Sequence, residues 1–164
     1  MELIAHRAGN LADTVAGALA VADAIELDVH QFRGRLEVRH AKVLWPLAMR
    51  WEPWSLIPAS EPRVTLDEVL AVVPAGSHLW LDLKGFTRGF ARRVLTVVGD
   101  RYDLTVSSRA WWILAVAGDR PGVRVMRSVG DRFQRWLVTH RWVRPTSPVP
   151  NHGVVMHERL ADAD

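Results

Sequence analysis

The sequence predicts an α/β protein whose strands form a parallel sheet. Two observations support this: short apolar runs alternate with longer helix-like segments, and the alternation repeats along the whole 164 residues. Strands that are separated by helices pair in parallel through right-handed crossovers. The length suits one hydrophobic core, so we expect residues 1–164 to form a single domain.

Each element is predicted from its own pattern. Short apolar or alternating runs predict strands at 3–5, 24–29, 79–84, 104–107, 123–126 and 153–157. Longer segments with apolar residues at helical spacing predict helices at 11–22, 65–73, 87–98, 109–117 and 131–141. The second of these helices has a start signal, because Thr65 is a suitable N-cap and Glu68 follows at capping-box spacing.

The composition limits the chemistry. With 49% hydrophobic and 24% charged residues, the chain is typical of a globular protein, and its lack of cysteine excludes disulfides and thiolate metal sites. Any metal must therefore be held by carboxylates, histidines and water. All cations except Lys42 and Lys84 are arginines, which suit phosphate. They are scattered along the chain, so we expect no nucleic-acid partner.

The segment 41–63 interrupts the alternation. It places Trp45, Trp51 and Trp54 among four prolines. Such a long connection is functional or covers the core. We favour the covering role, and the alternative is contact with a lipid or with the apolar part of a ligand. The chain shows neither a signal-peptide pattern nor a long apolar run, so we expect a cytoplasmic location.

Glu26 and Asp28 are the first candidates for a functional site. Two residues apart on a strand, they point to the same side of the sheet. Like charges held together are unfavourable unless a cation lies between them, and Mg²⁺ and Ca²⁺ prefer carboxylate oxygens. The alternative is the exposed polar face of a half-buried strand.

A tight reversal after this strand brings a histidine toward the acids. The run Arg33-Gly34-Arg35 is typical of a turn, and the next residues alternate again up to His40. If the reversal centres on Gly34, Asp28 lies opposite His40. We therefore expect an imidazole beside the two carboxylates.

Further polar residues lie at the ends of other predicted strands. His6 and Arg7 end the first strand, and Asp82 and Lys84 lie on the third. If these strands belong to a parallel barrel, their carboxyl ends form one face, where active-site residues collect. A single histidine in such a place is often structural, but two histidines, three acids and two cations at successive strand ends favour a site.

The order of these residues resembles the opening signature of glycerophosphodiester phosphodiesterases. The resemblance rests on His6-Arg7, on Ala24 to Val29 with both acids, and on Gly34 followed by Val38-Arg39-His40. It continues through Val64 to Leu70, Leu81-Asp82-Leu83-Lys84 and Val106-Ser107-Ser108. It implies a TIM-barrel-like (β/α) fold, here apparently incomplete, with about six of the eight strand units.

The resemblance also implies an activity and a set of roles. The activity is metal-dependent hydrolysis of glycerophosphodiesters or lysophospholipids. Glu26, Asp28 and Asp82 would hold Mg²⁺ or Ca²⁺, and Arg7 and Lys84 would bind the phosphate. His6 and His40 would act as general acid and base, without the sequence deciding which is which.

Some positions depart from the family pattern. Leu11 to Thr14 replace a stretch that contains a glutamate, Ala41 replaces an aspartate after the second histidine, and Asp82 replaces a glutamate. The family's last two strands have no counterpart, so we expect exposed sheet edges and a homodimer as one way to cover them. The alternative function is a catalytically inactive relative that keeps a phosphate or metal site for binding or regulation.

Overall fold

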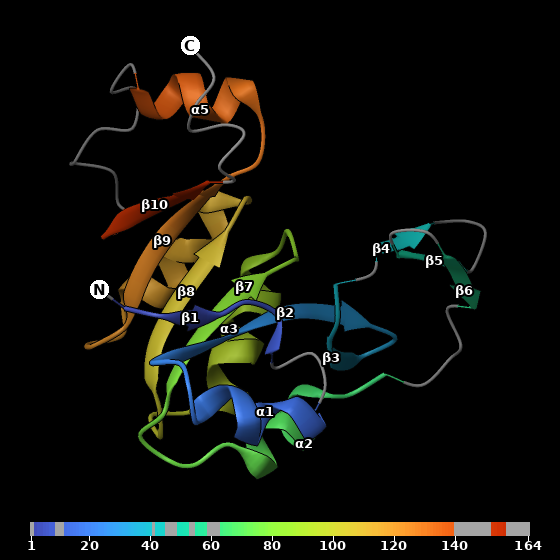
Figure 1. Ribbon diagram of the computed structural model, residues 1–164. Coiled ribbons are helices and arrows are strands. Elements are labelled where there is room, and N and C mark those ends of the chain that lie inside the picture. The colour runs from blue at the N-terminus through green and yellow to red at the C-terminus, as the bar shows by residue number, and fades with distance from the viewer. Residues whose placement is uncertain are drawn as a thin grey trace.

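The main sheet contains the six predicted strands. The computed structural model describes residues 2–8, 12–40, 42–44, 49–52, 55–58, 63–139 and 152–156. Six strands lie side by side, and every neighbouring pair is parallel. In order across the sheet they are β1 (Ile4–Ala5), β2 (Ala24–Phe32), β7 (His78–Leu83), β8 (Asp103–Ser108), β9 (Arg124–Val129) and β10 (Gly153–Met156). The sheet curls into a half-barrel, which confirms the predicted incomplete barrel (Figure 1).

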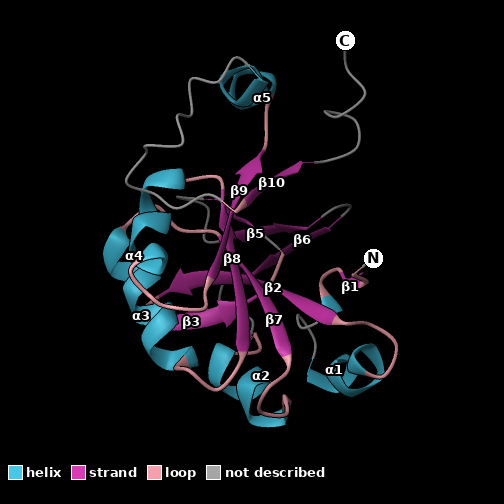
Figure 2. Ribbon diagram, turned by 90° about the vertical axis from the view of Figure 1, so that its left-hand side faces the viewer, coloured by secondary structure: helices cyan, strands magenta, loops and turns pink. Residues whose placement is uncertain are grey.

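Helices cover the outer side of this half-barrel (Figure 2). They are α1 (Ala12–Leu19), α2 (Leu66–Val72), α3 (Arg88–Val98) and α4 (Ala115–Gly118), whereas α5 (Arg132–Thr139) stands apart beyond the end of β9 (Figure 1). The predicted helix 109–117 is instead a 3-10 turn, η2 (Trp111–Leu114), that runs into α4. The predicted ends at Arg141 and His157 lie outside the described residues. Among the helices of the described ranges, none combines the length and apolar character that a membrane span requires.

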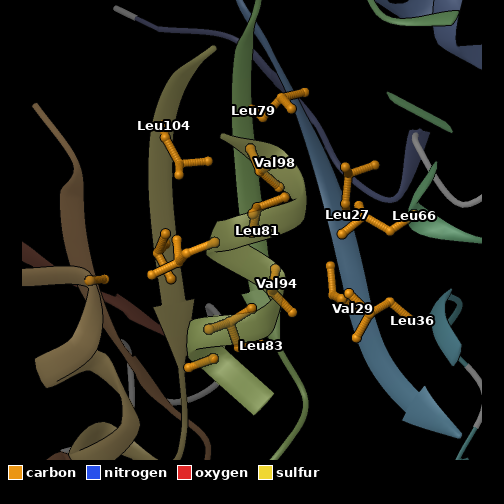
Figure 3. Close-up of a cluster of buried hydrophobic side chains, with 14 of the residues drawn as sticks. Leu27, Val29, Leu36, Leu66, Leu79, Leu81, Leu83, Val94, Val98 and Leu104 are labelled. Atoms are coloured by element: carbon orange, nitrogen blue, oxygen red, sulfur yellow. The ribbon is translucent and has the colours of Figure 1, made fainter. Parts of the chain in front are cut away.

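The strands divide their side chains between two faces. Leu27, Leu81 and Val106 form one cross-strand row, and all three are fully buried against the helices. Figure 3 shows this core, with residues from α2 and α3 packed onto β2, β7 and β8. The alternate row on the inner face is polar and contains Asp28 and Asp82. One face of each strand therefore stabilises the fold while the other is available for chemistry.

The predicted capping box at the start of α2 is present. The backbone N–H of Glu68 donates to Thr65 Oγ1 at 3.3 Å, and the backbone N–H of Thr65 donates to Glu68 Oε2 at 2.7 Å. Such a cap stabilises a helix by about 1 kcal/mol. It fixes where the chain turns from the segment after β6 into the helical layer.

The reversal after β2 differs by one residue from the prediction. A two-residue turn, Arg33-Gly34, joins β2 to the antiparallel strand β3 (Arg35–Val38). Both turn residues have positive φ, 47° and 79°, as the hairpin turn that matches strand twist requires. Val29 thus pairs with Val38, and Asp28 lies opposite Arg39 and not, as predicted, opposite His40.

The segment 41–63 forms a small antiparallel sheet. Its strands are β4 (Lys42–Leu44), β5 (Met49–Glu52) and β6 (Ser55–Pro58), and they stand to one side, beyond the β2–β3 hairpin (Figure 1). The cross-strand partners Trp51 and Leu56 are 50% and 59% exposed. At these two positions the segment does not cover the core, contrary to the role we favoured. Trp45 and Trp54 lie outside the described residues.

Candidate metal centre and its histidines

Three carboxylates meet where β2 pairs with the last residues of β7. Asp28 and Asp82 are direct partners across the parallel pair, and Glu26 precedes Asp28 by two residues on the same face. One oxygen from each of the three lies within 4.8 Å of the others. The side chain of Asp28 is only 2% exposed, and those of Glu26 and Asp82 are 13% and 12% exposed. The predicted acids therefore converge in a largely buried cluster.

Two cations lie against this cluster. Lys84, which follows β7, places its Nζ 2.8 Å from Asp28 Oδ1 and also contacts Asp82 Oδ2. Burial alone would lower the pKa of Lys84, but the carboxylates of Asp82 and Asp28 outweigh it and raise that pKa. Arg7 Nε lies 4.0 Å from Asp28 Oδ2. Both predicted phosphate ligands are thus beside the acids, and Lys84 keeps its charge.

Each predicted histidine contacts one of the carboxylates. His6, just after β1, contacts Glu26 Oε2 through its Nδ1. The next residue, Arg7, has a φ of 58°, and its backbone N–H donates to the same Glu26 oxygen at 3.3 Å. A non-glycine residue rarely adopts this left-handed conformation, and such strain gathers at functional sites.

His40 lies beyond the end of β3 and faces Asp28. The distance from His40 Nδ1 to Asp28 Oδ2 is 3.3 Å. Burial, followed by the charge of Arg7, lowers the pKa of His40, and Asp28 opposes this only in part. The imidazole is therefore neutral at neutral pH and able to accept a proton.

The chemistry of the three clustered carboxylates suits a divalent cation. Asp82 Oδ1 is buried and has no hydrogen-bond partner among the residues that the structure describes. Burial, and then the nearby charges of Asp28 and Asp82, raise the pKa of Glu26, although His6 and Lys84 oppose this. Unsatisfied oxygens and crowded negative charge are both relieved by a hard cation, for which carboxylates are the preferred ligands. The donor set fits Mg²⁺ or Ca²⁺.

Three further polar residues lie near this cluster, and the sequence analysis assigned them no role. His30 follows Asp28 on the same face of β2, and its Nε2 is buried without a partner in the described structure. Burial, followed by Arg39, lowers the pKa of His30 to about 3. Arg39 Nε also pairs with Glu37 Oε2 at 2.9 Å, and both side chains are under 10% exposed. The period-2 alternation from Glu26 could have indicated His30.

The seven predicted site residues thus come together from four segments. They lie at or just beyond the carboxyl ends of β1, β3 and β7 and in the part of β2 that pairs with β7, on the side where parallel barrels place active sites. The arrangement combines acids for a cation, fixed positive charge for an anion and two imidazoles for proton transfer. Of the departures from the family pattern, Leu11, Ala41 and the side chains of Ala12 and Asp13 lie outside what the structure describes.

A comparison with solved structures identifies the fold. The chain is similar to the crystal structure of a glycerophosphodiester phosphodiesterase from Thermotoga maritima, with a TM-score of 0.69 and 21% sequence identity. The match covers 95% of this chain and 74% of that one. Neither the protein-family models nor the curated proteins include a match to the sequence. The chain therefore has a glycerophosphodiester phosphodiesterase-like fold, as the resemblance predicted.

Proposed function

We propose that the protein is a metal-dependent phosphodiester hydrolase that acts on glycerophosphodiesters or lysophospholipids. The observation that carries this proposal is the placement of two imidazoles, His6 and His40, each on a different member of a three-carboxylate cluster. A phosphodiesterase needs these parts together: a site for a cation, positive charge for the phosphate and groups that move protons. The fold similarity to a phosphodiesterase supports the same reaction class.

Glu26, Asp28 and Asp82 would hold the metal ion. When bound there, Mg²⁺ or Ca²⁺ supplies Lewis-acid polarisation of the phosphoryl group. Lys84 and Arg7 lie beside the same carboxylates, so their charges would bind the phosphate oxygens and stabilise the negative charge that develops on them.

The two histidines would divide the proton transfers. His40 is neutral, so it takes the proton from the attacking hydroxyl, which belongs to water or to a neighbouring group of the substrate. The oxygen of that hydroxyl forms the new bond to phosphorus, and the bond to the leaving alkoxide breaks with its electron pair. His6, paired with Glu26, donates a proton to this alkoxide. Attack by water gives a monoester and an alcohol, whereas attack by a neighbouring substrate hydroxyl gives a cyclic diester and an alcohol.

One observation favours a second candidate function. The ammonium group of Lys84 already contacts both Asp28 and Asp82, so part of the negative charge in the cluster is neutralised from within. A site of this kind could bind a phosphate group and a metal without turnover. The alternative is therefore a non-catalytic, phosphate-binding relative.

Hydrolysis assays separate the two. We expect turnover of glycerophosphocholine or of a lysophospholipid with Mg²⁺ or Ca²⁺, no turnover with EDTA, and a rate about 10²- to 10⁴-fold lower in His40→Ala. Isothermal titration with each metal should be done on the same samples. Metal binding by a folded protein without turnover would establish the non-catalytic alternative, and neither binding nor turnover would overturn both.

A further inference from the structure

In the described part of the chain, the exposed aromatic residues lie on the side of the candidate site. Among the described residues, nine large hydrophobic side chains are exposed, and five of them are aromatic. These five lie in connections that leave the carboxyl ends of strands, as His40 and Lys84 do. They are Trp51, Phe86, Trp112, Phe133 and Trp136. We call these five residues the aromatic rim.

The opposite edge of the half-barrel differs in kind. Its exposed apolar residues are the aliphatic Leu3, Val21 and Val72, which lie in or beside the connections that enter the strands. Isolated exposed aliphatic residues are normal on a protein surface and need no partner. The segregation of aromatic rings to one edge is therefore a property of the site side and not of the surface in general.

Several rim residues are held in place by contacts that leave their rings exposed. Trp112 Nε1 donates to the carbonyl oxygen of Phe86 at 2.9 Å, which ties the loops after β7 and β8 together. Phe133 and Trp136 are stacked, with ring centroids 6.3 Å apart, and their side chains are 67% and 42% exposed. The helix that carries them, α5, has no buried residue and lies at the top of Figure 1, at the carboxyl end of β9.

The three connections that carry Phe86, Trp112 and the two rings of α5 are basic around these residues. Arg88 begins α3 two residues after Phe86, Arg109 precedes Trp112 by three residues, and Arg132 and Arg135 lie on α5 beside its two rings. Asp131 is the one acidic residue within the stretches 84–88, 109–112 and 130–136. Exposed aromatic rings between arginines are typical of surfaces that lie in the interface of a membrane containing anionic lipids.

We propose that the aromatic rim and the arginines of α5 form a docking surface for an anionic phospholipid layer. The rings would enter the interfacial region, where their apolar bodies are buried and their polar atoms stay hydrated, and the arginines would pair with lipid phosphates. Docked this way, the half-barrel presents its carboxylate and histidine cluster to the lipid headgroups. This last step rests on the proposed phosphodiesterase function, whereas the docking itself does not.

Sedimentation of the full chain with phospholipid vesicles tests the docking. We expect salt-sensitive binding to vesicles of phosphatidylcholine with phosphatidylglycerol, and weaker binding to phosphatidylcholine alone. The double variant Phe133→Ser, Trp136→Ser should bind at least about tenfold more weakly than the wild type, because the burial of two rings is lost. Arg132→Gln and Arg135→Gln should each weaken binding to the anionic vesicles by roughly fivefold.

The matched control is Val21→Ser, Val72→Ser, which removes equally exposed apolar residues from the opposite edge and should bind as the wild type does. The proposal is overturned if the wild type does not bind either vesicle, if the control loses as much binding as the rim variant, or if the rim variant merely dissociates a dimer seen by light scattering.

Turnover of water-soluble glycerophosphocholine, measured on the same proteins, should be equal in the wild type and the rim variant. If none of these proteins turns over glycerophosphocholine, the phosphodiesterase proposal is rejected, but the docking result is unaffected.

Discussion

The same strands build both edges of the half-barrel, but the polar and charged groups at the two edges differ in how fully they are paired. At the amino-terminal edge, His78 Nε2 lies 2.8 Å from Thr105 Oγ1 and His78 Nδ1 lies 2.6 Å from Glu2 Oε1. Beside them, Arg124 pairs with Asp103 at 2.7 Å. At the carboxyl edge, three acids share one close lysine, and Asp82 Oδ1 has no partner in the described structure.

The pairing of charged groups distinguishes structural residues from functional ones better than residue type does. Both edges contain histidines, carboxylates and cations, so a list of polar residues would not distinguish them. The acids and bases described at the amino-terminal edge pair with one another, which stabilises the fold. At the other edge three largely buried acids face Lys84 and Arg7, and an added cation would relieve the crowded negative charge.

The largest expected difference is in catalysis. Asp28→Asn should lower the rate of glycerophosphocholine hydrolysis by about 10³-fold, because it removes a charge that holds both the metal and Lys84. His78→Gln at the opposite edge should leave kcat/KM within about twofold. Initial rates at saturating metal measure both. A comparable loss in the two variants would mean that the two edges are not functionally distinct.

The next effect concerns stability without metal. Lys84→Met should lower the free energy of unfolding by about 3 kcal/mol, because Asp28 and Asp82 then repel each other in a buried place. Arg124→Met should lower it by less than about 1 kcal/mol, because its pair with Asp103 is exposed. Urea denaturation in EDTA measures both. Equal losses would contradict the difference in burial.

Metal binding should sharpen the contrast. Mg²⁺ or Ca²⁺ at about 100 times its Kd should raise the free energy of unfolding by about 2.7 kcal/mol. His78→Gln should keep this gain and Asp82→Asn should lose most of it. The gain should also shrink as the pH falls, because Glu26 has a raised pKa and protons compete for it. Thermal melting with metal or with EDTA is the measurement, and a full gain in Asp82→Asn would remove that residue from the metal site.

The smallest effect is a pH dependence at His30. The pKa of His30 in the folded protein is about 3, below its ordinary value near 6.5. Below pH 6.5 the unfolded chain therefore takes up a proton that the folded protein refuses, and stability falls by about 1.4 kcal/mol per pH unit toward pH 3. Metal-free His30→Gln should lack this contribution. Urea unfolding at pH 6 and pH 5 tests it, and equal slopes in variant and wild type would show that His30 is not buried neutral.

Most of the fold could be predicted because local and long-range signals agree in it. The six parallel strands have apolar patterns of their own, and the capping box at Thr65 and Glu68 marks the start of α2. The segment 41–63 was harder. Its strands are three or four residues long, and prolines separate or end them, so they carry too little pattern to distinguish a small sheet from a covering loop.

The site was predicted as a group of residues but not in its local geometry. The sequence placed the reversal on Gly34, whereas the turn consists of Arg33 and Gly34, and Arg33 is not a residue that signals positive φ. His40 reaches Asp28 all the same, because it lies beyond the last paired residue of β3 and is not bound by the strand register. The partners of Arg39 and His30 depend on burial, which spacing alone does not give.

The division of each strand between two faces has a consequence for how this chain tolerates change. Leu27, Leu81 and Val106 face the helices, whereas Asp28, Asp82 and Ser107 face the interior one residue later. In a scan of all single substitutions, damage to cellular abundance and damage to activity should therefore alternate residue by residue along β2, β7 and β8. Selection for abundance would act on the residues that face the helices, and selection for activity would act on the residues that face the interior. A residue of one set can therefore be changed with little effect on the property that the other set controls.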